Sequence, residues 1–187
     1  MDPVLLQHEQ IATTIAGAVS YRVRYRSHDV QGRPTESTGL VVAPATPGED
    51  RRVLSWTHGT TGTGDAGCPS AQPDPARELA LYFAPGSTAA VDYGVPGLQR
   101  FVDDGWVVTA TDYQGMGTPG VHQYTVNRTN AVDGIAIVHA ARELPVGAGH
   151  RVGVIGWSQG GGTAAASVEL DPADYGDLEV VGAAAMS

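Results

Sequence analysis

Residues 151–170 read RVGVIGWSQGGGTAAASVEL, and this stretch decides the fold. Its first five residues are mostly apolar, as in a buried strand, and the residues after Gln159 are small, as in a helix that packs closely on a sheet. Ser158 stands between them, with Gly156 two residues before it and Gly160 two residues after it. Glycine at these positions relieves crowding in a sharp strand-to-helix turn and leaves the serine hydroxyl exposed. The stretch therefore predicts a strand–turn–helix unit with Ser158 as candidate nucleophile.

The same turn offers a place for developing negative charge. The backbone N–H of Gln159 would lie at the positive end of the following helix, where it can bind the oxyanion of a tetrahedral acyl intermediate. A second donor is expected from the loop HGTTG, because RVLSWT (residues 52–57) reads as a buried strand that runs directly into it. We therefore assign the second oxyanion donor to the backbone of Gly59 and Thr60, and we expect the ring of His58 to be structural.

Strand and helix patterns alternate along the whole chain. Residues 19–26 (VSYRVRYR) alternate apolar and basic side chains, and residues 38–43 (TGLVVA) follow after a turn, so the two predict an antiparallel hairpin. Strands are also predicted at residues 52–57, 106–111, 151–155 and 180–186, and helices near 75–83 and at 96–104, 130–143 (capped by Asn130) and 159–170. The pattern predicts one α/β domain over residues 1–187, with a mixed, mostly parallel sheet and helices on both faces.

Composition narrows the classes of function. The chain has 187 residues, of which 42% are hydrophobic and 17% charged, and a net charge of -9 that would repel nucleic acid. All eleven basic residues are arginines, which excludes a Walker P-loop and Schiff-base chemistry within this chain. The single cysteine, Cys68, permits no intrachain disulfide, and its Gly/Pro-rich surroundings favour a structural thiol. No stretch approaches the ~20 apolar residues that span a membrane, and the N-terminus shows no secretory signal pattern.

Four stretches of the chain together resemble one protein family. They are HGTTG, WVVTATDYQGMGTPG, NRTNAVDG and GVIGWSQGG, and the similarity extends from about Leu5 to the end of the chain. These stretches resemble the secretory lipases of the α/β-hydrolase superfamily, a group of bacterial and fungal triacylglycerol lipases and esterases with a G-Y-S-Q-G-G turn. Trp157 stands where tyrosine is common in that turn, which is a mild departure from the family pattern.

The resemblance carries expectations about chemistry. It implies the α/β-hydrolase fold and hydrolysis of an ester or lipid substrate by a Ser-Asp-His triad, with no metal and no cofactor, in an enzyme that is often extracellular. By the motif match, Ser158 would be the nucleophile and Gln159 one oxyanion donor, and the loop at Gly59 and Thr60 would supply the other.

The general base of such a triad is missing from this sequence. Triads of this superfamily follow the chain order Ser, Asp or Glu, then His, yet all six histidines precede Ser158. We therefore expect the chain to be the N-terminal part of a longer enzyme, truncated after about the sixth strand and lacking the triad Asp and His. By itself it should show little activity, and its last strand should form an exposed sheet edge.

Other candidate residues and functions are weaker. His122, in the loop GVHQY, is the best-placed alternative base, and Asp112 is expected to brace the DYQGMG turn rather than to act in catalysis. The glycine pattern GMGTPG (residues 115–120) lacks the following helix and acidic residue of a dinucleotide site, so we expect no NAD. A non-catalytic α/β module that binds acyl groups or a protein partner stays open, as do a serine peptidase and an acyltransferase on the same fold.

Overall fold

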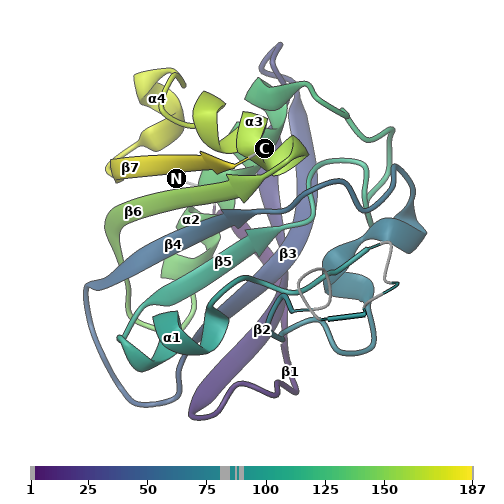
Figure 1. Ribbon diagram of the computed structural model, residues 1–187. Helices are drawn as coiled ribbons and strands as arrows, with labels where there is room; N and C mark the ends of the chain where they lie inside the picture. The colour runs from purple at the N-terminus through teal and green to yellow at the C-terminus, as the bar shows by residue number, and fades with distance from the viewer. Residues whose placement is uncertain (1–2, 81–84, 87, 89–90, 187) are drawn as a thin grey trace.

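One mixed sheet organises the computed structural model of the chain, which describes residues 3–80, 85–86, 88 and 91–186 (Figure 1). The described strands lie in the order β1-β2-β3-β5-β4-β6-β7. Strands β5, β4, β6 and β7 are parallel, whereas β1, β2 and β3 are joined antiparallel and β3 is antiparallel to β5. The strands are β1 (Leu5–Ile11), β2 (Ala18–His28), β3 (Pro34–Pro44), β4 (Arg51–Thr57), β5 (Val107–Thr111), β6 (Ala148–Trp157) and β7 (Glu179–Met186).

Helices cover both faces of this sheet. In the view of Figure 1, α2 (Asn127–Arg142) lies behind the sheet and α1 (Leu98–Asp103) in front of it. The short helices α3 (Gln159–Ala166) and α4 (Pro172–Tyr175) follow β6, and two 3₁₀ turns, η1 (Asp65–Gly67) and η2 (Pro69–Ala71), follow β4. The predicted fold class, a mixed and mostly parallel sheet between helices, is confirmed.

The core is divided by the sheet because successive strand residues face opposite sides. In β4, Val53 belongs to the cluster that includes Ile135 of α2, whereas the next residue, Leu54, belongs to the cluster that includes Leu98 and Val102 of α1. Burial of each such aliphatic side chain contributes about 1.5–3 kcal/mol to the free energy of unfolding. These two apolar layers pack against the two faces of the sheet. The carboxyl ends of β4, β5 and β6 lie on the same side of it (Figure 1).

Several predicted elements differ from the observed ones. Strand β1 was not predicted, so the last strand is the seventh and not the sixth; β1 carries the polar residues QHEQ and is largely exposed. Residues 75–80 of the helix predicted near 75–83 are not helical, because Glu78 forms a bridge with Val95; residues 81–83 lie outside the described residues. Helix α2 begins at Asn127, and Asn130 is buried inside the helix and is not its N-cap.

The last strand lies at the edge of the sheet, as predicted. β7 pairs with β6 along one side, and most of its residues are exposed. Val181 and Met186 are about half exposed. Within the described ranges, none of the helices has the length and apolar character needed to cross a membrane.

Candidate active site

The turn between β6 and α3 holds Ser158 in an unusual conformation. Its φ of 56° and ψ of -118° lie in a region that L residues rarely adopt, which costs about 1–3 kcal/mol and is typical of functional turns. The side chain is exposed at the carboxyl edge of the sheet, and the backbone N–H of Ser158 donates to the carbonyl of Met186 in β7 at 2.8 Å. The turn therefore presents the Ser158 hydroxyl to solvent from a backbone that neighbouring strands hold in place.

The two glycines that flank Ser158 are required by close packing. A Cβ on Gly156 would lie 2.0 Å from the carbonyl oxygen of Gly160 and 2.1 Å from Oγ1 of Thr57. A Cβ on Gly160 would lie 1.8 Å from the carbonyl oxygen of Thr57. The Thr57 hydroxyl also donates to the carbonyl of Gly160 at 2.9 Å. The end of β4 is thus in direct backbone contact with the turn, in agreement with the crowding predicted from the sequence.

The loop after β4 lies beside the same turn. Thr57, the last residue of β4, pairs with Gly156 of β6, so the loop begins next to the residues before Ser158. A Cβ on Gly59 would lie 2.8 Å from Cε3 of Trp157. The absence of a side chain at Gly59 therefore allows the loop to lie close to the Trp157 ring. Gly59 is buried and Thr60 is exposed.

The structure brings the four predicted site residues to one place. Ser158 and Gln159 come from the turn after β6, and Gly59 and Thr60 come from the loop after the neighbouring strand β4. Among the described residues, the backbone N–H groups of Gln159, Gly59 and Thr60 have no hydrogen-bond acceptor. N–H groups without an acceptor are available to bind an oxyanion, as an oxyanion site requires.

His122 contacts Gln159 and not Ser158. The Nε2 amide of the Gln159 side chain lies 2.8 Å from Nε2 of His122, and Nδ1 of His122 lies 3.1 Å from the carbonyl oxygen of Gln114. A carbonyl only accepts, so Nδ1 carries the proton and Nε2 accepts from the amide. Both ring nitrogens are occupied, and burial lowers the pKa of His122. His122 therefore does not act as a base toward Ser158 in this arrangement. The sequence contained no local signal for this contact.

Two other polar residues near the site are structural. His58 is buried, and its Nδ1 donates to the carbonyl of Gly59 at 2.6 Å. The ring centroids of His58 and Tyr113 lie 4.4 Å apart. Burial lowers the pKa of His58. Asp112 accepts from the hydroxyl of Thr38 at 2.7 Å and from the N–H of Ser70 at 2.8 Å. Asp112 thus braces β3 and the η2 turn, and the expectation from the sequence that it braces the DYQGMG turn is wrong.

Cys68 lies against the buried Asp112 carboxylate. Burial and that negative charge raise the pKa of the Cys68 thiol to about 12, so it is not a nucleophile at neutral pH. In the part of the chain that the structure describes, no group of three or more His, Cys, Asp or Glu side chains is placed to hold a metal ion. No hydrogen bond among the described residues joins a histidine to Ser158.

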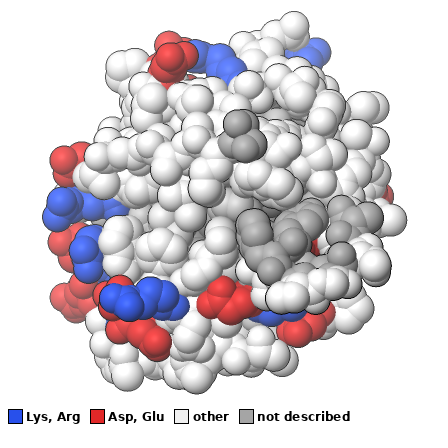
Figure 2. Space-filling model, in the orientation of Figure 1, with Lys and Arg blue, Asp and Glu red and all other residues white. Residues whose placement is uncertain are grey.

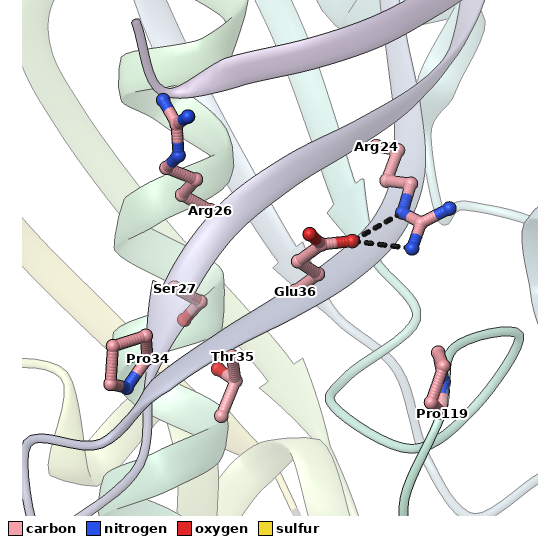
Figure 3. Close-up of a pocket in the computed structure, with 7 residues that line it drawn as sticks. All are labelled: Arg24, Arg26, Ser27, Pro34, Thr35, Glu36 and Pro119. Atoms are coloured by element: carbon pink, nitrogen blue, oxygen red, sulfur yellow. Dashed lines mark hydrogen bonds and ion pairs between the residues drawn. The ribbon is translucent and has the colours of Figure 1, made fainter. Parts of the chain in front are cut away.

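A separate hollow of about 360 Å³ lies over β2 and β3 (Figure 3). Arg24 and Glu36 form an ion pair across it, with Nε of Arg24 2.6 Å from the carboxylate. None of the predicted site residues lines this hollow; its lining residues are Arg24, Arg26, Ser27, Pro34, Thr35, Glu36 and Pro119.

Comparison with known proteins identifies the family of the chain. A model of the secretory lipase family matches residues 82–187, more than half of the chain. Lipase A of Arthroderma benhamiae is 29% identical over 171 residues, which are 89% of this chain and 35% of that protein. The chain therefore spans about a third of the length of this curated relative.

Solved structures show the same fold. Candida antarctica lipase A in its closed state has a TM-score of 0.66 at 19% identity over 95% of this chain and 40% of its own. A ligand-bound form of LipA from Xanthomonas oryzae, a rice cell wall degrading esterase, has a TM-score of 0.64 at 21% identity over 89% of this chain and 45% of its own. The chain thus has the α/β-hydrolase fold, and by the match over more than half its length it belongs to the secretory lipase family.

Proposed function

We propose that residues 1–187 carry the nucleophile and the oxyanion hole of a serine-dependent carboxylic ester hydrolase, a lipase that acts on triacylglycerols or shorter-chain esters. The proposal rests on one observation above all. Ser158 is exposed in a strained turn, and three backbone N–H groups of this turn and of the loop after the neighbouring strand β4 find no acceptor among the described residues. Membership in the secretory lipase family supports the same class of chemistry and an extracellular enzyme.

The chemistry follows from the placement of these groups. The Ser158 hydroxyl attacks the ester carbonyl and passes its proton to a base, and the carbonyl electrons move onto the oxygen. The N–H of Gln159 and those of Gly59 and Thr60 then stabilise that oxyanion. When the carbonyl re-forms, the bond to the alcohol breaks and the alcohol takes the proton. Water hydrolyses the acyl-enzyme by the same route and restores Ser158. One oxyanion donor of this kind is worth roughly 3–4 kcal/mol in the transition state.

The surroundings of the site suit an uncharged substrate. Residues 152–168, which include the turn, contain no charged residue, and neither do residues 53–64 of β4 and its loop. Charged side chains gather mainly around the edges of the face seen in Figure 2, and the middle of that face is nearly free of them. An acyl ester can approach such a surface without displacing bound counter-charges.

We also propose that this chain is inactive alone and works within a longer protein that supplies the triad Asp and His. Two observations support this. No described histidine bonds to Ser158, and the chain spans 35% of the curated relative's length. Without a base, a serine hydroxyl is a poor nucleophile at neutral pH.

The test is hydrolysis by the protein extended beyond residue 187 and by its Ser158→Ala variant. Rates are measured on p-nitrophenyl butyrate and on emulsified triacylglycerol. The variant should lose at least about 10³-fold in kcat. The matched control is Ser167→Ala. Among the described residues, the buried Ser167 hydroxyl bonds only the carbonyl of Ala164, so this substitution should leave kcat unchanged. Equal rates for wild type and Ser158→Ala would remove Ser158 from the mechanism.

A further inference from the structure

We propose that His122 and Tyr124 are positioning residues that hold the two halves of the oxyanion hole from the loop between β5 and α2. This inference rests on the proposed function and assigns a role to a loop that takes no part in the bond-making steps. Its basis is that the loop contacts both oxyanion segments, the turn after β6 through His122 and the loop after β4 through Tyr124.

The loop is folded back on itself so that these residues reach the site. Tyr113 and Gly115, just after β5, have φ values of 69° and 74°. A Cβ on Gly115 would lie 2.4 Å from the backbone nitrogen of His122, so only glycine permits the two segments to approach so closely. The ring of His122 stacks on that of Tyr113, with centroids 5.8 Å apart and an interplanar angle of 24°. The position of His122 is thus fixed from both the backbone and the ring.

The first contact fixes the Gln159 side. His122 must keep its proton on Nδ1, which faces the carbonyl of Gln114, and therefore presents a lone pair on Nε2 to the Gln159 amide. Both His122 and Gln159 are at least nine-tenths buried, so water does not replace this bond. Gln159 is the first residue of α3 and directly follows the strained Ser158. A side chain anchored there restrains the direction in which the Gln159 N–H points.

The second contact fixes the other side. The Tyr124 hydroxyl lies 3.2 Å from Oγ1 of Thr60, and the ring centroids of Tyr124 and His122 are 6.1 Å apart. Two residues of one loop therefore contact Gln159 and Thr60, which follow different strands, β6 and β4. An oxyanion donor acts only within a few tenths of an ångström of its best position, so a loop that sets the spacing of both donors affects the transition state more than substrate binding.

Kinetics of the extended, active protein test the inference. His122→Phe keeps a ring to stack on Tyr113 but removes both hydrogen bonds, and it should lower kcat on the order of 10- to 100-fold with KM nearly unchanged. His122→Gln places a carbonyl oxygen near the former Nε2 and should recover most of that loss. Tyr124→Phe should lower kcat by a smaller factor. The control, His150→Phe, alters a partly exposed histidine at the opposite end of β6 and should leave kcat unchanged.

A spectroscopic measurement on the 187-residue chain gives an independent readout. Long-range ¹H–¹⁵N spectra should show His122 protonated on Nδ1 only, and Gln159→Met should change its Nε2 resonance. A proton on Nε2 in the wild-type chain would overturn the inference even if the His122→Phe variant fails to fold.

The two proposals fail in different ways. If Ser158→Ala abolishes hydrolysis while His122→Phe retains full kcat, the positioning role is wrong and the proposed function stands. If Ser158→Ala retains full activity, the proposed function is wrong, and the positioning role that rests on it falls too.

Discussion

The packing around Gly160 gives a sharp test of the turn that presents Ser158. Gly160→Ala would place a Cβ 1.8 Å from the carbonyl oxygen of Thr57 and 2.6 Å from that of His58. Both are backbone atoms, one in the last residue of β4 and one in the residue after it, so no side-chain rotation can relieve the contact. Gly160 does not have a positive φ, and the substitution therefore adds no strain of its own backbone. Its whole cost comes from forcing β4 and α3 apart.

Two opposing effects determine how much Gly160→Ala changes the free energy of unfolding. Overpacking costs typically 1–3 kcal/mol, and contacts this short with backbone atoms justify the upper end, about 3 kcal/mol. Replacing glycine by alanine within a helix returns up to about 1 kcal/mol. The net loss in the free energy of unfolding should be about 2 kcal/mol, which lowers the Tm of a domain this size by roughly 4–8 °C.

Guanidinium unfolding followed by tryptophan fluorescence measures this change. The matched control is Gly162→Ala in the same helix, where the nearest atoms to the new Cβ belong to the movable amide of Asn127. The helix-propensity gain is the same for both variants, so their difference isolates the contact with β4. Gly162→Ala should be close to wild type or slightly more stable. Equal midpoints for Gly160→Ala and Gly162→Ala would refute the close approach of β4 to the turn.

Three further changes have expected outcomes. Ser158→Gly should be about 1 kcal/mol more stable than Ser158→Ala in thermal unfolding, since only glycine relieves the positive φ; equal stabilities would mean that the turn holds no strain. Burial raises the pKa of Asp133 to about 6, above its unfolded value, so folding holds its proton more tightly and stability falls by about 3 kcal/mol as pH rises from about 4 to about 6. Asp133→Asn should flatten this part of the stability–pH curve, and an unchanged slope would contradict the assignment. Cys68, whose pKa burial and Asp112 raise to about 12, should react with Ellman's reagent near pH 8 only after unfolding, and rapid labelling of the native chain would show that the thiol is accessible.

Local patterns predicted most of the fold because those patterns coincide with burial. The strand β4 and the hairpin of β2 and β3 have clear apolar periodicity, and each was predicted within a few residues of its observed bounds. Strand β1 gave no such signal, because it lies at the edge of the sheet and most of its side chains face solvent. The helix expected near residue 75 failed for a different reason. Glu78 pairs with the backbone at Val95, a long-range contact that local propensity cannot indicate.

The candidate site likewise has a part that local sequence predicts and a part that depends on long-range contacts. The spacing of Gly156, Ser158 and Gly160 predicted the turn, because the steric need for glycine at these positions is local. The contact of His122 with Gln159 spans 37 residues, and it depends on how the loop after β5 folds back at Gly115. The sequence contains Gly115, but no local pattern indicates that the loop folds back there and brings His122 to Gln159.

The central claim is that the Ser158 hydroxyl is the nucleophile. The most direct measurement is covalent trapping of the extended, active protein with a fluorophosphonate, followed by peptide mass spectrometry. We predict one phosphonyl group per chain, on Ser158, and no label after Ser158→Ala. A label on another residue, or equal labelling of the Ser158→Ala variant, would contradict the account.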